Sequence, residues 1–259
     1  MNTLLKKCMT ALAMVAGLAA AAPSQAAPAA DLQGKNVVLV HGAFADGSSW
    51  DKVIPLLQAR GLHVVAVQNP LSSLKDDVAA TRRAIDQQTG PVVLVGHSWA
   101  GVVISEAGND EKVSSLVYVA AFAPDSGQSI NDVLKGLPPA PWASELQKDS
   151  GGFLTLSENA IIHDFASDLP AAQARIIAAS QGPWFAGCLD DKVTQAAWHN
   201  KPSTFVITGK DHMIPAQLQA AMAKNIGATV VNVDASHVVM VSQPQKVAAA
   251  IIAAAEKAK

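Results

Sequence analysis

The segment Pro91-Val92-Val93-Leu94-Val95-Gly96-His97-Ser98-Trp99-Ala100-Gly101 joins a continuous apolar run to a serine in a setting of small residues. The apolar run predicts a buried strand, and the glycines and alanine after it predict a sharp turn into a helix. Such a turn has room only for small side chains and pushes the serine hydroxyl into the open, as in a nucleophile elbow. Ala100 departs from the G-x-S-x-G pattern, and a packing turn without chemistry is the alternative, so the rest of the chain must decide.

Short β-branched runs alternate with helix-like stretches along most of the chain. The strand candidates are Asn36–Val40, Leu62–Val67, Val92–Val95, Leu116–Val119, Thr204–Thr208 and Thr229–Val233. The helix candidates are Trp50–Gln58, Asp76–Gln88, Val102–Gly108, Gln217–Lys224 and Pro244–Ala255. Most strand candidates are apolar throughout, as in parallel strands covered on both faces. We therefore predict a doubly wound α/β fold with a mostly parallel sheet of about six strands. Such sheets bind ligands at the carboxyl ends of their strands.

The alternation stops between about Pro124 and Pro202, where Gly, Pro and short helical pieces take over. The clearest of these pieces are Ile130–Leu134, Ala143–Lys148 and Ala171–Ala179. We predict that this insertion, about residues 125–202, forms a helical cap over the carboxyl ends of the strands. It holds half of the chain's twelve aromatic residues, namely Trp142, Phe153, Phe165, Trp184, Phe185 and Trp198. We expect most of these rings to form the core of the cap, and an apolar substrate pocket to be lined by Phe44, Phe122, Trp142 and Trp184.

Two residues beyond the insertion follow strands in the order that a serine nucleophile requires. A serine hydroxyl attacks only when a base removes its proton, and that base needs an acid to orient it. His237 follows the last predicted strand, where the base belongs, and Asp211 follows the strand before it, where the acid belongs. Asp125 follows an earlier strand and stays as a rival acid, whereas His212 adjoins the acid but precedes the last strand. The chain order favours Ser98, Asp211 and His237.

The end of the first predicted strand offers an oxyanion hole. This feature needs two backbone N–H groups, one just after the nucleophile and one from the loop after an early strand. Trp99 supplies the first group. In Val40-His41-Gly42-Ala43-Phe44, the glycine permits a close turn and leaves the Ala43 N–H free to supply the second.

Residues 1–26 have the pattern of a secretory signal peptide. Lys6 and Lys7 form a basic region, the apolar stretch Ala11–Ala22 follows, and Ser24-Gln25-Ala26 offers a cleavage site. The apolar stretch is too short for a good membrane anchor. We expect export to the periplasm or the medium, and a mature domain of residues 27–259 with no integral membrane segment.

Composition bounds the partners of the mature chain. Loss of Lys6 and Lys7 shifts the formal net charge from −2 to −4, and no basic cluster predicts a nucleic-acid partner. Only Cys188 remains after removal of Cys8, so an intrachain disulfide is excluded, and Cys188 is expected to be a small buried residue. The scattered histidines predict no metal site. The oligomeric state stays open, with a homodimer as one option.

These features together resemble the α/β-hydrolases, above all the plant methylesterase and hydroxynitrile-lyase branch and its bacterial esterase relatives. The matching stretches are His41–Trp50, Gly96–Ser98, Tyr118–Ser126, Lys210–Pro215 and Ser236–Pro244. The resemblance implies Ser98 as nucleophile, Asp211 as acid, His237 as base, the Ala43 and Trp99 amides as oxyanion donors, and no cofactor. Trp99 and Ala100 depart from the family pattern; the former replaces a smaller residue and is expected to narrow or floor the acyl pocket.

The resemblance implies a serine hydrolase that cleaves small-molecule carboxylic esters through an acyl-enzyme. Two alternatives stay open: a lyase on the same triad, and a ligand-binding protein without turnover. Lyases of this branch carry a lysine directly after the catalytic histidine and a larger residue at the position of Gly42. This chain has Val238 and glycine at these positions, which favours hydrolysis.

Overall fold

The computed structural model describes residues 32–257, and the predicted signal peptide lies outside them. Six parallel strands form one sheet in the order β2-β1-β3-β4-β8-β9. Their bounds are β1 (Asn36–Val40), β2 (His63–Val67), β3 (Val92–His97), β4 (Val113–Val119), β8 (Ser203–Thr208) and β9 (Thr229–Val233). The predicted parallel sheet is confirmed. Every residue of β1 and β3 is buried, as expected for apolar strands at the centre of a doubly wound sheet.

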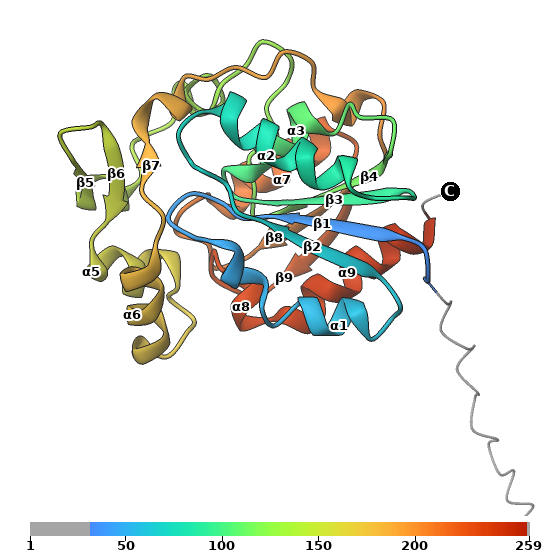
Figure 1. Cartoon of the computed structure of the whole chain (residues 1–259). Helices are drawn as coiled ribbons and strands as arrows, with labels where there is room; N and C mark the ends of the chain where they lie inside the picture. Colours follow the sequence, from blue (N-terminus) through green and yellow to red (C-terminus); the bar gives the residue numbers. More distant parts are fainter. Residues whose placement is uncertain (1–31, 258–259) are drawn as a thin grey trace, which may run out of the picture.

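Helices cover both faces of this sheet (Figure 1). One layer holds α2 (Leu74–Asp86), α3 (Ala100–Ala107) and α7 (Ala216–Asn225), and the other holds α1 (Ile54–Gln58), α8 (Val239–Ser242) and α9 (Pro244–Lys257). The predicted helix Trp50–Gln58 is shorter than expected. Gly47–Trp50 form a 3-10 turn, and α1 starts only at Ile54, where Pro55 suits the first turn because it has no amide N–H to leave unpaired.

The cap lies between β4 and β8. It was predicted to be helical, but it contains both helices and strands. Its helical elements are α4 (Ile130–Leu134), η2 (Pro141–Glu145), α5 (Glu158–Ala160), η3 (Ile161–Phe165), α6 (Ala171–Ser180), η4 (Ala186–Leu189) and η5 (Ala197–His199). A three-stranded antiparallel sheet joins β5 (Leu146–Lys148), β6 (Phe153–Leu156) and β7 (Trp184–Phe185).

The predicted helix Ala143–Lys148 is therefore wrong in its second half. Leu146–Lys148 pair with Leu154–Leu156 across a turn that contains Gly152 at a φ of +87°. Only glycine adopts this backbone conformation without strain, so the turn commits the segment to a hairpin. Pairing across the hairpin overrides the local preference for a helix.

The carboxyl edge of the sheet concentrates unusual backbone geometry. Within residues 32–257, four non-glycine residues have positive φ, and each follows one of the first four strands: Phe44 (58°) after β1, Leu71 (57°) after β2, Ser98 (54°) after β3 and Ala120 (45°) after β4. Such residues cost about 1–3 kcal/mol each and gather where function demands them. The strain marks this edge, under the cap, as the candidate functional site.

Candidate active site

Ser98 lies at the turn between β3 and α3, where the backbone leaves no space for larger neighbours. A Cβ on Gly96 would lie 2.6 Å from the Ala100 carbonyl oxygen, and one on Gly42 would lie 2.8 Å from the Cβ of Ser98. The Ser98 carbonyl oxygen accepts hydrogen bonds from the amides of Gly101 (3.0 Å) and Phe122 (3.2 Å). The turn is therefore a rigid elbow, and the alanine at position 100 fits within it, fully buried.

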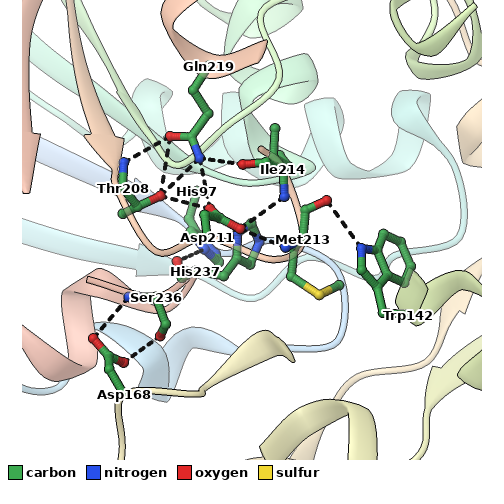
Figure 2. Close-up of polar contacts among 10 residues, drawn as sticks. All are labelled: His97, Trp142, Asp168, Thr208, Asp211, Met213, Ile214, Gln219, Ser236 and His237. Atoms are coloured by element: carbon green, nitrogen blue, oxygen red, sulfur yellow. Dashed lines mark hydrogen bonds and ion pairs between the residues drawn. The ribbon is translucent and has the colours of Figure 1, made fainter. Parts of the chain in front are cut away.

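Asp211 and His237 form a buried pair, as the chain order predicts (Figure 2). His237 Nδ1 lies 2.8 Å from Asp211 Oδ2, and both side chains are almost completely shielded from solvent. The same carboxylate oxygen accepts from Gln219 Nε2 (2.9 Å) and Thr208 Oγ1 (2.7 Å). The other accepts from the amides of Met213 (2.8 Å) and Ile214 (2.9 Å). Both carboxylate oxygens of Asp211 therefore have hydrogen-bond partners.

These partners decide the charge of Asp211. Burial on its own raises the pKa of a carboxyl group, but the neighbouring His237 and the hydrogen bonds that favour the carboxylate outweigh it, so the pKa of Asp211 is lowered. A carboxylate that only accepts requires His237 Nδ1 to carry the proton. In the neutral ring, the His237 Nε2 atom is then the lone-pair acceptor, and this buried atom has no hydrogen-bond partner in the described part of the chain.

His237 lies at the same corner as Ser98. Its ring centroid is 4.7 Å from that of His97, the residue before Ser98, and 5.2 Å from that of Phe165, which lines one cavity together with Ser98. His97 is completely buried beneath the elbow, and its Nε2 contacts the His237 carbonyl oxygen at 3.0 Å. Burial lowers the pKa of His97 well below its usual value, so it stays neutral and supports the His237 backbone.

The rival residues lie elsewhere. Asp125 pairs with His199 at 2.7 Å on the exposed side of the cap. His212 lines the cavity, but its Nδ1 contacts the His163 carbonyl oxygen at 3.1 Å and it is half exposed. Asp125 contacts His199 instead of His237, so the geometry joins His237 to Asp211 among the candidate acids.

The loop after β1 is fixed around the second predicted oxyanion donor. His41 Nε2 accepts from the Asn69 amide at 2.9 Å, which leaves Nδ1 to donate to the Gly42 carbonyl oxygen at 2.9 Å. Burial lowers the pKa of His41, consistent with this neutral ring. Within residues 32–257, the Ala43 and Trp99 amides donate no hydrogen bond, and Trp99 directly precedes α3, whose N-terminus attracts negative charge.

Trp99 is anchored through its side chain. Its indole Nε1 donates to Asp77 Oδ2 at 2.7 Å, while Asp77 Oδ1 accepts from the Leu71 amide at 2.8 Å. Asp77 is completely buried, and this burial raises its pKa to about 6. The Trp99 ring lies 5.4 Å from that of Trp184, and both residues line the cavity.

An apolar cavity of about 590 Å³ opens in front of Ser98. All four residues predicted for the pocket line it: Phe44, Phe122, Trp142 and Trp184. No lysine or arginine is among the described residues of its wall. Of the remaining cap aromatic residues, Phe165 lines the cavity and the other three do not. The rings of Phe153 and Phe185 pack on each other with centroids 5.4 Å apart, and Trp198 Nε1 donates to the Pro124 carbonyl oxygen.

Sequence reasoning missed two parts of the wall. Phe165 contacts His237 from the cap, and Leu137–Pro141 close another side of the cavity. The Pro138-Pro139-Ala140-Pro141 run could have indicated a stiff, non-helical wall segment. Nothing local marks Phe165, because its role depends on how the cap folds back over the sheet.

The chain matches the alpha/beta hydrolase family over residues 37–250. It belongs to this family. Methylesterase 8 from Arabidopsis thaliana is 24% identical over 251 residues, which cover 88% of this chain and 92% of the relative. Alpha-hydroxynitrile lyase from Arabidopsis thaliana is 25% identical over 238 residues, which cover 81% of this chain and 92% of the relative. A solved structure of a pyrethroid hydrolase from Sphingobium faniae JZ-2 has a TM-score of 0.74 at 22% identity, covering 86% of this chain and 98% of its own.

The alpha/beta hydrolase family, its fold and the predicted branch are thereby confirmed, and the relatives support a hydrolase of the esterase type. Residues 32–257 contain no helix long and apolar enough to span a membrane. They also contain no group of three or more His, Cys, Asp or Glu residues arranged to hold a metal ion. Cys188 is buried and unpaired, and burial raises its pKa to about 12, so its thiol is a packing group.

Proposed function

We propose that this protein is an exported serine esterase that cleaves neutral, apolar carboxylic esters. The observation that carries the proposal is the buried Asp211–His237 pair, whose unpartnered Nε2 lies at the corner of a strained Ser98 elbow. The cavity supports the substrate class, because an apolar wall without lysine or arginine offers no counter-charge to an anionic substrate.

The chemistry follows from these positions. Ser98 Oγ attacks the ester carbonyl carbon while His237 Nε2 takes its proton, and Asp211 stabilises the resulting imidazolium. The Ala43 and Trp99 amides stabilise the oxyanion. Collapse of the intermediate expels the alcohol, which receives its proton from His237, and leaves an acyl group on Ser98. Water activated by His237 then releases the carboxylic acid.

Hydrolysis is favoured over cyanide-releasing lyase activity. A lyase must stabilise the cyanide anion as it leaves, which calls for a positive charge beside the base. Val238 follows His237 and is buried, and the described wall of the cavity offers no lysine or arginine. Gly42 lies so close to Ser98 that a side chain at position 42 would contact the serine. Because glycine has no side chain, the approach to the Ser98 hydroxyl stays open.

The test is a panel of p-nitrophenyl and methyl esters of graded acyl size, with mandelonitrile assayed in parallel at matched concentration. We expect ester turnover that depends on Ser98, a preference for neutral apolar acyl groups, and no Ser98-dependent cyanide release. Cyanide release without ester turnover would establish the lyase alternative. Binding of esters without turnover of any of them would establish a ligand-binding protein.

We further propose that residues 1–26 direct export and are removed. The basic, apolar and small-residue regions in that order support this proposal. Mass spectrometry of protein from the periplasm or medium should find an N-terminus at or near Ala27. Intact Met1 on protein recovered from the cytoplasm would contradict it.

A further inference from the structure

The residue before the candidate base is held by the cap. Ser236 is completely buried, and its amide and its hydroxyl both donate to the carboxylate of Asp168 (Figure 2). The amide contact, to Asp168 Oδ2, is 3.0 Å long, and the hydroxyl contacts Oδ1. Asp168 lies between η3 and α6, 68 residues earlier in the chain, so this is a tertiary contact rather than a local turn.

The same cap segment contacts other parts of the site. The Phe165 ring packs on the His237 ring at 5.2 Å, and the His163 carbonyl oxygen contacts His212 Nδ1 at 3.1 Å. His163–Asp168 therefore contact both loops that carry the acid and the base. Part of this segment is the π-helix η3, a conformation that is frequent at functional sites.

Ahead of the base, the other contacts of the loop that carries His237 are backbone hydrogen bonds and one exposed ion pair, between Lys210 Nζ and Asp234 Oδ2 at 2.7 Å. After β9 ends at Val233, the Ala235 carbonyl oxygen accepts from the Lys210 amide at 3.0 Å. Asp168 is the partner of both donors of Ser236, and without it two donors of a buried residue lose their acceptor. A displacement of about 1 Å in a catalytic group can cost about 100-fold in rate.

We propose that Asp168 is a positioning residue, which fixes the backbone at Ser236 and thereby holds the His237 imidazole in line between Asp211 and Ser98. The cap then contributes to proton transfer as well as enclosing the substrate. This inference rests on the proposed function, because it assigns a means of alignment to the proposed base.

The test compares Asp168→Ala, Ser236→Ala and their double variant with the wild-type protein. Two quantities are measured: kcat and KM on a p-nitrophenyl ester, and the rate at which a fluorophosphonate probe labels Ser98. We expect the Asp168→Ala variant to lose about 10- to 100-fold in both kcat and labelling rate, with KM within about twofold. The double variant should be no slower than Asp168→Ala, because Asp168→Ala already removes the hydroxyl contact that Ser236→Ala removes.

Two further variants separate alignment from general destabilisation. Asp168→Asn keeps one carbonyl oxygen as an acceptor and should recover part of the lost rate. Glu158→Ala removes an exposed acid of the same cap, whose partner is Arg175, and should label at the wild-type rate. If Asp168→Ala does not fold, Asp168→Asn and Ser236→Ala carry the same comparison.

Labelling of all variants within about twofold of wild type would overturn the positioning role, as would a change in KM alone. Absence of labelling in the wild-type protein itself would instead contradict the proposed function. The two failures are therefore distinguishable.

Discussion

The carboxyl edge of the sheet and the cap above it enclose the same cavity, but they are built in different ways. At the sheet edge, each candidate residue lies in the turn or loop that follows a strand: Ser98 after β3, Asp211 after β8 and His237 after β9. In the cap, short elements meet the sheet through contacts between residues far apart in the chain, such as Trp142 with Met213. Chemistry at the edge follows from strand order, whereas enclosure and alignment by the cap follow from tertiary packing.

The largest contrast concerns two aspartates, one from each region. Asp211→Asn should lower kcat by about 10⁴-fold, because an amide cannot hold His237 in the tautomer that leaves Nε2 unprotonated. Asp125→Asn removes only the exposed contact with His199 and should change kcat by less than about threefold. Steady-state kinetics of both variants on one ester measure the contrast. If Asp125→Asn lowered kcat more than Asp211→Asn, Asp125 in the cap would be the catalytic acid.

Two glycines extend the comparison to folding. A Cβ on Gly101, in α3, would lie 1.9 Å from the Phe122 carbonyl oxygen, a backbone atom that cannot give way. Gly101→Ala should therefore cost about 3 kcal/mol or more of unfolding free energy, or abolish folding. Gly127, in the cap, has a φ of +80° and open space around it, so Gly127→Ala should cost only about 1 kcal/mol. Urea unfolding of both variants measures the two losses of unfolding free energy. Equal losses would show that the backbone around Gly101 can relax.

Buried and exposed carboxyl groups should respond to pH with opposite signs. Burial raises the pKa of Asp77 from 3.8 to about 6, so the folded protein binds this proton more readily than the unfolded chain. Stability from this group therefore rises as the pH falls through 6 toward 4, by at most about 3 kcal/mol. In the cap, the hydrogen bond from His199 lowers the pKa of the exposed Asp125, and its small contribution is lost as the pH falls.

The measurement is the Tm of wild type and of Asp77→Asn between pH 8 and pH 4.5. The wild-type Tm should rise relative to that of Asp77→Asn as the pH falls. If the wild-type Tm instead falls relative to that of Asp77→Asn on acidification, the ionised Asp77 carboxylate is stabilising, and the hydrogen bonds that it accepts from Trp99 and Leu71 outweigh burial.

The smallest expected effect concerns the bond between the cap and the acid loop. Trp142 Nε1 donates to the Met213 carbonyl oxygen at 3.2 Å, and the Met213 amide donates to Asp211. Trp142→Phe keeps an aromatic wall but loses this donor, so kcat should fall about two- to tenfold, in line with one neutral hydrogen bond. An unchanged kcat with a raised KM would confine Trp142 to substrate contact.

The same division explains what could be predicted from sequence. The limits of β1 and β9 match the prediction residue for residue, because continuous β-branched runs between turn residues have few alternatives. Ser98, Asp211 and His237 could be proposed because each lies in the turn or loop after such a strand. Leu146–Lys148 could not be assigned, because its strand exists only through pairing with β6. Asp168 has no local signal at all, since its partner Ser236 is 68 residues away.

The central claim is that Ser98 is a nucleophile activated by His237. The most direct measurement is to react the protein with a fluorophosphonate probe and to map the adduct by tandem mass spectrometry. We predict one adduct per chain, on Ser98, with no labelling of Ser98→Ala and labelling of His237→Ala slowed by several orders of magnitude. An adduct on another serine, or wild-type labelling of His237→Ala, would contradict the account.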